Sequence, residues 1–479
     1  MLLRFSILKK FVLVFLLVSV IPLCALGIST LWNLRAIGRG AVDNTTVQME
    51  KRAKESLELR AVELADRVTQ LLNSCEGDLF TLAMLPREAE VYRRFALNHR
   101  KTIWAREGTN ERPVEVHKEI PLYREIAFIG ANGIEAIRIV EDRVAERVEL
   151  RDVSKPENTT YKSEKYFQET IKLKTGDIYV SHVTGWFVSR DEQLQGARSV
   201  EEAVEGKKFE GVVRMATPCF TETGQFEGIV IVSLDHRHLM EMTLHILPTD
   251  ERFVVFPSYA SGNYAFMFDD DGWIIAHPKF YDIRGTYRDG SECDPRAPSY
   301  TRERLLAGEV PFNLDHVDFI NPNYAFVARE VRAGRSGVIS TRNVGGTPRV
   351  MAYAPIFYDR IPYNKHGIFG GMTIGVQTAK FAEPALLASA KIDDIVDQTK
   401  QNTLAILGIT ALAVIFLGTF LARKFTQPIM YLACKARQIA EGHIPYYVAV
   451  QTGDELELLG RNFDDMATEI RRHRESLDR

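Results

Sequence analysis

The sequence is poor in cysteine and has no excess of charge of either sign. There are 5 cysteines among 479 residues, and the formal net charge is −3. This balance, without a basic patch, gives no reason to expect a nucleic-acid partner. Three cysteines, Cys75, Cys219 and Cys293, fall between the two uncharged stretches described below. They permit one bridge but no disulfide framework.

The motifs of common enzyme active sites are also missing. The sequence has no GxxxxGK(S/T) phosphate loop, no HExxH, no GxSxG, no GGDEF-type signature and no glycines of a kinase ATP lid. His473 occupies a heptad position and lacks the E-x-x-x-P context that usually follows a kinase histidine. We therefore expect no enzyme, no catalytic residue and no cofactor within these residues.

Charge is absent altogether from two long apolar stretches, residues 11–32 and 403–422. At about 1.5 Å of rise per residue, each is long enough as a helix to cross a hydrocarbon core about 30 Å thick. The first stretch is longer than the apolar core of a signal peptide, which favours a membrane anchor over a cleaved leader. The sequence thus predicts two transmembrane helices and a lipid bilayer as a partner.

Basic residues fix the expected orientation of these spans. They lie just before the first span and just after the second, at Arg4, Lys9, Lys10, Arg423 and Lys424. By the positive-inside rule, segment 1–10 and the tail 423–479 are cytoplasmic, and residues 33–402 are exported. The expected location is the bacterial inner membrane, with the exported region in the periplasm or outside the cell.

The exported region begins with a predicted stalk helix over residues 46–75. Apolar residues recur there at spacings of three or four, at Ala53, Leu57, Ala61, Leu64, Val68 and Leu71. This spacing places them on one face of a helix. The stripe could pack against its own domain or against a second subunit.

Strand patterns follow, and they occur twice in the same order. Residues 126–140 and 264–276 each read as an apolar run, a polar turn closed by Gly133 or Gly272, and a second apolar run. This is typical of a β-hairpin. Each copy continues with a further pair of apolar runs, so we expect two sheet modules, a distal one over 76–240 and a proximal one over 250–380. The aspartates of FDDDGWIIAHP, residues 268–278, occupy the hairpin tip and are interpreted as a turn rather than a metal site.

Tandem sheet modules on a long helix between two membrane spans resemble the double Cache (dCache) sensor domain of bacterial receptors. The resemblance covers residues 33–400 and rests on the paired hairpins, on Lys165-Tyr166-Phe167, on 176–181 (GDIYVS), and on Ala216-Thr217-Pro218 before 228–230 (GIV). It implies two PAS-like antiparallel modules and a small-molecule pocket in the distal one. Amino-acid-binding members carry an arginine two residues before the aromatic pair, where this sequence has Glu164, which puts carboxylate recognition by that clamp in doubt.

A distal pocket can be assembled from aromatic and polar residues in this part of the sequence. The candidate ligand-binding residues are Tyr161, Ser163, Tyr166, Tyr179, His182, Arg214 and Asp235. A separate cluster, His238, Glu241 and His245, has spacings that share one helix face and could bind zinc. The alternative for this cluster is the solvated face of a helix that links the two modules.

The tail carries the most specific pattern of the sequence. Two apolar heptad stripes flank a connector, and a proline stands at the membrane exit; the pattern comprises Pro428, Ile429, Leu432, Ala436, Ile439, Gly442, Glu455, Leu456, Leu459, Phe463, Met466 and Ile470. Heptad spacing calls for a coiled-coil partner. The tail, residues 423–479, resembles a HAMP domain, which implies a parallel four-helix bundle formed by a homodimer.

The expected fold is therefore α+β: two tandem PAS-like antiparallel modules on a long helix, two membrane spans, and a helical HAMP tail. The expected function is transmembrane signalling, in which a small external ligand is sensed and relayed to a cytoplasmic output. The heptad register runs through His473 to Leu477 without a helix stop, so we expect an output beyond residue 479 or on a partner, first of all a histidine kinase. A diguanylate cyclase, a phosphatase, a chemotaxis region or a separate partner protein are the alternatives.

Overall fold

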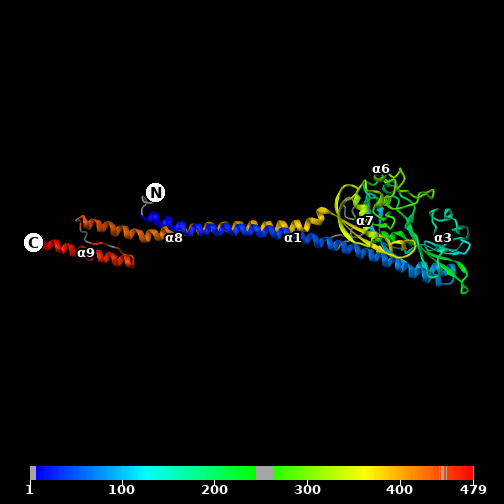
Figure 1. Ribbon diagram of the computed structural model, residues 1–479, viewed down its shortest axis with the longest axis horizontal. Helices are drawn as coiled ribbons and strands as arrows, with labels where there is room; N and C mark the ends of the chain where they lie inside the picture. Colours follow the sequence, from blue (N-terminus) through cyan, green and yellow to red (C-terminus); the bar gives the residue numbers. More distant parts are fainter. Residues whose placement is uncertain (1–6, 244–263, 442, 444–446, 449, 478–479) are drawn as a thin grey trace. The chain divides into compact units, whose positions relative to one another are not determined.

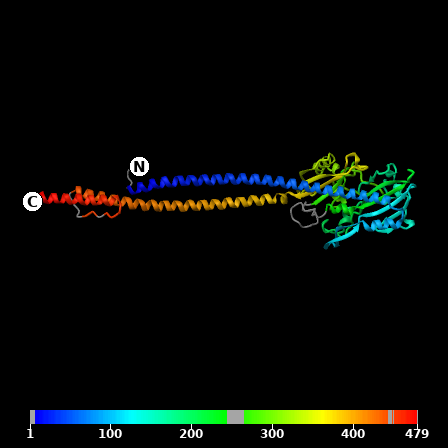
Figure 2. The same ribbon diagram turned by 90° about the horizontal axis from the view of Figure 1, so that it is seen from below.

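The computed structural model describes residues 7–243, 264–441, 443, 447–448 and 450–477. The chain divides into two compact units, one of residues 1–47 with 385–479 and the other of residues 48–384. Two helices, α1 (Ile7–Met84) and α8 (Thr378–Ala440), each contribute to both units. The ribbon of each unit can be followed in Figures 1 and 2.

The unit of residues 48–384 contains two large antiparallel sheets. The first sheet has seven strands, six of them in the order β5-β4-β3-β9-β8-β6, with β7 paired to β8. Its strands are β3 (Tyr123–Gly130), β4 (Glu135–Val140), β5 (Arg143–Val144), β6 (Tyr179–Val180), β7 (Thr184–Gly185), β8 (Gly211–Phe220) and β9 (Phe226–Asp235). A separate hairpin is formed by β1 (Arg100–Thr109) and β2 (Arg112–Pro121).

The second sheet has five strands in the order β11-β10-β14-β13-β12. They are β10 (Tyr264–Asp269), β11 (Ile274–Ala276), β12 (Gly337–Arg342), β13 (Pro348–Phe357) and β14 (Ile368–Gln377). The order of its first four strands parallels the β4-β3-β9-β8 portion of the first sheet. In both sheets the first strand of the predicted hairpin pairs with the last long strand: β3 with β9 in the first sheet and β10 with β14 in the second. These paired strands form the buried centre of each sheet.

Short helices lie in the connections between the strands, and several of them pack against the sheets. The helices are α2 (Ala89–Asn98), α3 (Tyr166–Thr170), α4 (Arg190–Leu194), α5 (His236–Glu241), α6 (Arg302–Ala307) and α7 (Pro322–Arg332). Single 3-10 turns occur at Arg147–Glu149, Pro156–Asn158, Phe280–Asp282, Leu314–His316 and Tyr363–Lys365. Asn321 begins α7 by accepting the Asn323 N–H, and Pro322 supplies the first helical residue.

Helix α1 runs along both sheets in either view (Figures 1 and 2). It is longer than the predicted stalk, and it ends at Met84, two residues before Pro86, because a residue that precedes proline disfavours helical geometry. The stripe packs into the same core as the two sheets, with Ala61 and Val68 fully buried. The sequence left open whether this stripe packs against its own domain or against a second subunit. In the structure it packs against its own domain.

In the other unit, α1 and α8 approach closely at one glycine. A Cβ atom built on Gly27 would lie 2.3 Å from Leu407 Cδ1, so a larger residue here would require the Leu407 side chain to shift. Among the described residues, one segment, Leu386–Ala440, is long and apolar enough to cross a membrane, and Leu17–Thr30 is a shorter apolar helix. The first of the two predicted spans therefore remains a prediction.

The unit ends with a connector and α9 (Glu455–Leu477). Gly453 has φ +72°, and the Asp454 carboxylate accepts the Leu456 N–H at 3.0 Å, which caps the start of α9. The expected mixed α and β architecture, with antiparallel sheets and a long N-terminal helix, is confirmed. The assignment of the two sheets as tandem Cache modules remains a prediction.

Candidate functional site

A cavity of about 300 Å³ lies between elements of the first and second sheets. One wall comes from α3 and the segment around β6 and β7, and the other from the segment after β10 and from the loops that follow β11. The lining residues are Ser163, Glu164, Lys165, Tyr166, Tyr179, Ser181, His182, Val183, Thr184, Trp273, Arg284, Gly285, Thr286, Glu292, Cys293 and Pro311. Four of the seven predicted ligand-binding residues, Ser163, Tyr166, Tyr179 and His182, are among them.

Tyr166 begins α3, and its ring packs in a small core with Phe167 and Ile231. The Arg214 guanidinium carbon lies 5.0 Å from the centre of the ring. The Tyr166 hydroxyl is buried and has no hydrogen-bond partner among the residues that the structure describes. Burial raises the pKa of this hydroxyl, so it stays neutral and can donate or accept a hydrogen bond.

Tyr179 and His182 come from β6 and the segment directly after it. Burial raises the pKa of Tyr179 to about 12. Burial on its own lowers the pKa of His182, but the hydrogen bond that its ring N–H donates to Asp270 and the nearby carboxylate of Asp269 outweigh it, so the pKa lies above its usual value. Carboxylates of the second sheet and its turn therefore stabilise the protonated form of His182.

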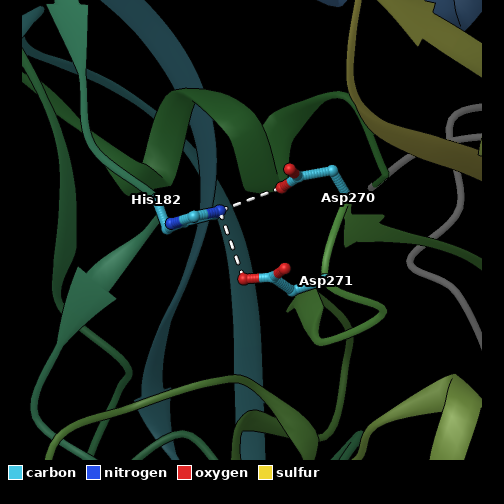
Figure 3. A group of neighbouring side chains, drawn as sticks. All are labelled: His182, Asp270 and Asp271. Atoms are coloured by element: carbon cyan, nitrogen blue, oxygen red, sulfur yellow. Dashed lines mark hydrogen bonds and ion pairs between the residues drawn. The ribbon is translucent and has the colours of Figure 1, made fainter. Parts of the chain in front are cut away.

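The three consecutive aspartates at the end of β10, Asp269 to Asp271, begin the predicted turn. Asp269 Oδ1 accepts the Trp273 N–H at 2.9 Å, and Gly272 has φ +82°. The same turn also carries two carboxylates toward the first sheet. The His182 Nε2 atom lies 2.9 Å from Asp270 Oδ1 and 3.5 Å from Asp271 Oδ2 (Figure 3). The backbone thus forms the predicted turn, but the sequence interpretation misses this contact between the sheets.

Arg214 does not face the cavity, because its guanidinium is taken up by a buried ion-pair network. Its side chain is 1% exposed, and its Nε donates to Glu164 while its Nη1 donates to Ser233 Oγ at 2.8 Å. Glu125 Oε2 lies 3.4 Å from Nη1. Burial alone raises the pKa of Glu125, but Arg214 and two further arginines lower it to about 2. Glu164, the departure from the dCache pattern, thus neutralises an arginine inside the fold.

Two further predicted residues, Tyr161 and Asp235, also lie outside the cavity lining. The Tyr161 hydroxyl donates to the Glu210 carbonyl at 3.1 Å. Asp235 caps α5 by accepting the Arg237 N–H at 2.9 Å and pairs with the Arg237 side chain at 2.7 Å. In this structure both side chains support local geometry.

The predicted zinc cluster lies partly outside the described residues, since His245 is not among them. His238 is buried, and its Nε2 lies 2.9 Å from the Pro121 carbonyl. Glu241 accepts the Trp104 N–H at 3.0 Å. Both groups are therefore already engaged by the backbone, and the zinc assignment remains a prediction.

Sequence reasoning did not find the second-sheet wall of the cavity. Arg284 donates to Asp269 Oδ2 at 2.9 Å and lies 3.5 Å from Glu292, while Trp273 lies beside the turn. These residues lie about a hundred positions from Tyr166 and His182 in the sequence. Nothing in their local pattern marks them, because the contact between the sheets is long-range.

The heptad residues of the tail lie in two helices. Pro428, Ile429, Leu432, Ala436 and Ile439 are in α8, and Glu455, Leu456, Leu459, Phe463, Met466 and Ile470 are in α9, whereas Gly442 lies outside the described residues. Several apolar members are exposed in the single chain, including Ile429 at 45%, Leu459 at 44% and Met466 at 42%. Such a stripe is what a coiled-coil partner covers.

Residues 420–472 match the HAMP domain family, so the tail is a HAMP domain. No curated protein matches the chain.

Solved structures resemble the chain at low identity. One is the extracellular domain of vpHK1S-Z8, assigned as a histidine kinase (13% identity, TM-score 0.39, covering 72% of this chain and 96% of that one). Two are ligand-binding domains of amino acid chemoreceptors of Pseudomonas aeruginosa PAO1. They are PctC with GABA (13% identity, TM-score 0.32, 66% and 95% covered) and PctB with L-Arg (13% identity, TM-score 0.31, 69% and 94% covered). At these TM-scores the likenesses carry no argument about ligand or activity.

Proposed function

We propose that this chain is a transmembrane sensory receptor of the inner membrane, in which a small molecule binds the cavity between the two sheets. The observation that carries this proposal is the position of the cavity. It is lined from both sheets, and one of its lining residues, Tyr166, has a buried hydroxyl without a protein partner among the described residues. Leaving such a group unpaired costs about 1–3 kcal/mol, which a ligand hydrogen bond can recover.

A short covalent and hydrogen-bonded route supports transmission from this cavity. The cavity-wall segment is tied to the loop after β13, because Val180 N–H donates to the Ile361 carbonyl at 2.8 Å and the Tyr363 hydroxyl donates to the Ser181 carbonyl at 3.0 Å. That loop leads into β14, and α8 begins at the next residue, Thr378. A ligand that binds more tightly when the two sheets stand at one particular separation would shift the conformational equilibrium toward that separation. The loop and β14 would then carry the displacement to α8.

The loop is also tied to α1. Arg360 forms two hydrogen bonds of 3.0 Å with the Glu76 carboxylate, one to each oxygen. Helices α1 and α8, which contain the two apolar stretches, are therefore both connected to the cavity wall. We infer that ligand binding displaces α8 relative to α1 and that the HAMP domain converts this displacement into a change of helix packing.

The remaining parts of the proposal concern assembly and output. The receptor acts as a homodimer whose α8 and α9 stripes cover one another, with two membrane spans, residues 33–402 exported as a dCache sensor, and both ends of the chain cytoplasmic. The proposed output is a histidine kinase, and a diguanylate cyclase, a phosphatase or a chemotaxis region would use the same relay. The two sheets are its distal and proximal modules.

The full chain in lipid nanodiscs tests the proposal in a thermal-shift screen against a library of small polar metabolites. We expect compounds that raise the melting temperature, and the Tyr166→Phe variant, which loses only the hydroxyl, should reduce that shift. The matched control is Tyr161→Phe, because Tyr161 is also buried in this region but donates to Glu210.

The outcomes separate the cavity from other sites. A shift that Tyr166→Phe reduces and Tyr161→Phe retains supports binding in the cavity. Shifts of equal size in both variants would place the ligand elsewhere and refute the proposal. The relay is tested with a compound that raises the melting temperature. It should change the rate of disulfide cross-linking between cysteines introduced at Leu459 in two chains. An unchanged rate would show that ligand binding does not alter the packing of the HAMP helices.

A further inference from the structure

A second feature lies at the junction of the two sheets, beside the cavity. His182 follows β6 of the first sheet, while Asp270 and Asp271 belong to the turn after β10 of the second. One ligand atom from each residue lies within 4.8 Å of the other two. Figure 3 shows the imidazole directed between the two carboxylates, which approach it from one side. Three groups that can ligate a metal ion thus converge from opposite sides of an interface.

The separations fit the edges of a coordination shell. Zinc binds histidine nitrogen and carboxylate oxygen at about 2.0–2.2 Å, which places neighbouring ligand atoms about 3.0 Å apart in an octahedron and about 3.4 Å apart in a tetrahedron. The His182 Nε2 atom lies 2.9 Å from Asp270 and 3.5 Å from Asp271. These two separations match those of neighbouring ligand atoms in such a shell, and the Asp270 and Asp271 oxygens lie within 4.8 Å of one another.

Charge at the junction also favours a cation. Two guanidinium groups, those of Arg284 and Arg332, stand among five carboxylates, namely Asp269, Asp270, Asp271, Glu292 and Asp315. Arg284 lies 2.9 Å from Asp269 but 3.8 Å from Asp271, so it neutralises the first aspartate of the turn more than the third. Negative charge is left in surplus beside the imidazole, and a divalent ion would balance it.

The neighbouring cavity offers space for the additional ligands that a metal ion would need beside these three residues. Three protein ligands leave at least one position of a zinc or manganese shell open, and that position must be filled by water or by a ligand. His182 and Arg284 both line the cavity of about 300 Å³, which has room for such molecules.

We propose that His182, Asp270 and Asp271 form a binding site for a divalent transition-metal ion of the Zn²⁺ class, which clamps the first sheet to the second. One imidazole with two carboxylates is a donor set that such ions accept. The ion adds a second input to the proposed receptor, because it fixes the spacing of the sheets that the cavity ligand would otherwise select. Metal binding requires no cavity ligand, so it can succeed or fail independently of the proposed sensing function.

The test is calorimetric titration of ZnCl₂ into the full chain, without an affinity tag, in nanodiscs at neutral pH after removal of metal with a chelator. We expect one Zn²⁺ per chain whose affinity falls at least tenfold in His182→Ala and in Asp271→Asn. The Asp271 side chain is 58% exposed, so that variant leaves the packing intact. Matched controls are His366→Ala and Asp289→Asn, both at exposed positions outside the site.

Thermal unfolding gives a second readout. Zn²⁺ should raise the melting temperature of the wild type and of both controls, and should leave that of His182→Ala unchanged. Three results would overturn the proposal: no saturable binding, equal binding in the wild type and Asp271→Asn, or binding lost only in His238→Ala. A His182-dependent change of melting temperature with pH, without any effect of Zn²⁺, would also overturn it and leave a protonated ion pair in its place.

Discussion

The buried pair of Arg214 and Glu164 allows a quantitative test of how the first sheet is stabilised. Arg214→Met removes a side chain that is 1% exposed and keeps a similar apolar length. Glu164 then loses its hydrogen bonds from Arg214 and keeps the Tyr161 N–H at 3.1 Å. Leaving a buried charge without its partner costs about 3–5 kcal/mol. We expect the free energy of unfolding to fall by that amount.

The double variant Arg214→Met/Glu164→Met should recover most of this loss. Both charges are then gone, and Glu125 keeps Arg138 at 3.3 Å and Arg151 at 3.1 Å, so no charge is left unpaired. Replacing a buried ion pair by apolar side chains of similar volume is often neutral or stabilising. The coupling free energy in the double-mutant cycle should therefore be at least about 2 kcal/mol.

Urea denaturation of the full chain in nanodiscs, followed by tryptophan fluorescence, measures these values. Three of the four tryptophans, Trp104, Trp186 and Trp273, belong to the unit of residues 48–384, so most of the signal reports on the fold that holds the pair. Arg335→Met is the control, because its ion pair with Glu330 is exposed and should contribute less than about 1 kcal/mol. A double variant whose loss equals the sum of the two single losses would refute the reasoning.

Two further predictions concern pH and assembly. The pKa of Glu125 is lowered to about 2 from 4.5, so its stabilising contribution is present above about pH 4.5 and is lost as pH falls toward 2. Between about pH 7 and pH 3 the wild type should lose about 2 kcal/mol more than Glu125→Gln in the same denaturation assay, and parallel losses would contradict the assigned pKa. In α9, Leu459→Lys should weaken self-association of the chain at least tenfold by mass photometry, because it places a charge in the heptad stripe. Leu458→Lys, at a neighbouring position that is 61% exposed and outside the stripe, should leave association unchanged, and equal effects of the two would argue against the predicted seam.

Local pattern was enough for much of this architecture. The hairpins close at Gly133 and Gly272 because these turns need positive φ, and both residues adopt it. The α1 stripe and the cap of α9 at Asp454 follow in the same way from helical spacing and from side-chain hydrogen bonding to the backbone. Signals of this kind involve residues a few positions apart, so the sequence displays them directly.

The candidate site was only partly predictable for the opposite reason. Ser163, Tyr166, Tyr179 and His182 could be proposed from their chemistry, whereas Arg214 has the same chemistry and is buried in an ion-pair network. No local pattern distinguishes an arginine that grips a ligand from one that neutralises a glutamate within the fold. That choice depends on which carboxylates the folded sheet brings within reach.

The amino-acid sequence by itself determined the apolar stretches, the repeated hairpins, the long helix and the HAMP domain, because each is encoded in residue spacing along the chain. Only the tertiary structure decided that the cavity lies between the two sheets and that His182 meets Asp270 and Asp271. Those contacts join residues almost ninety positions apart, and they exist only where the packing of one sheet against the other brings the two segments together.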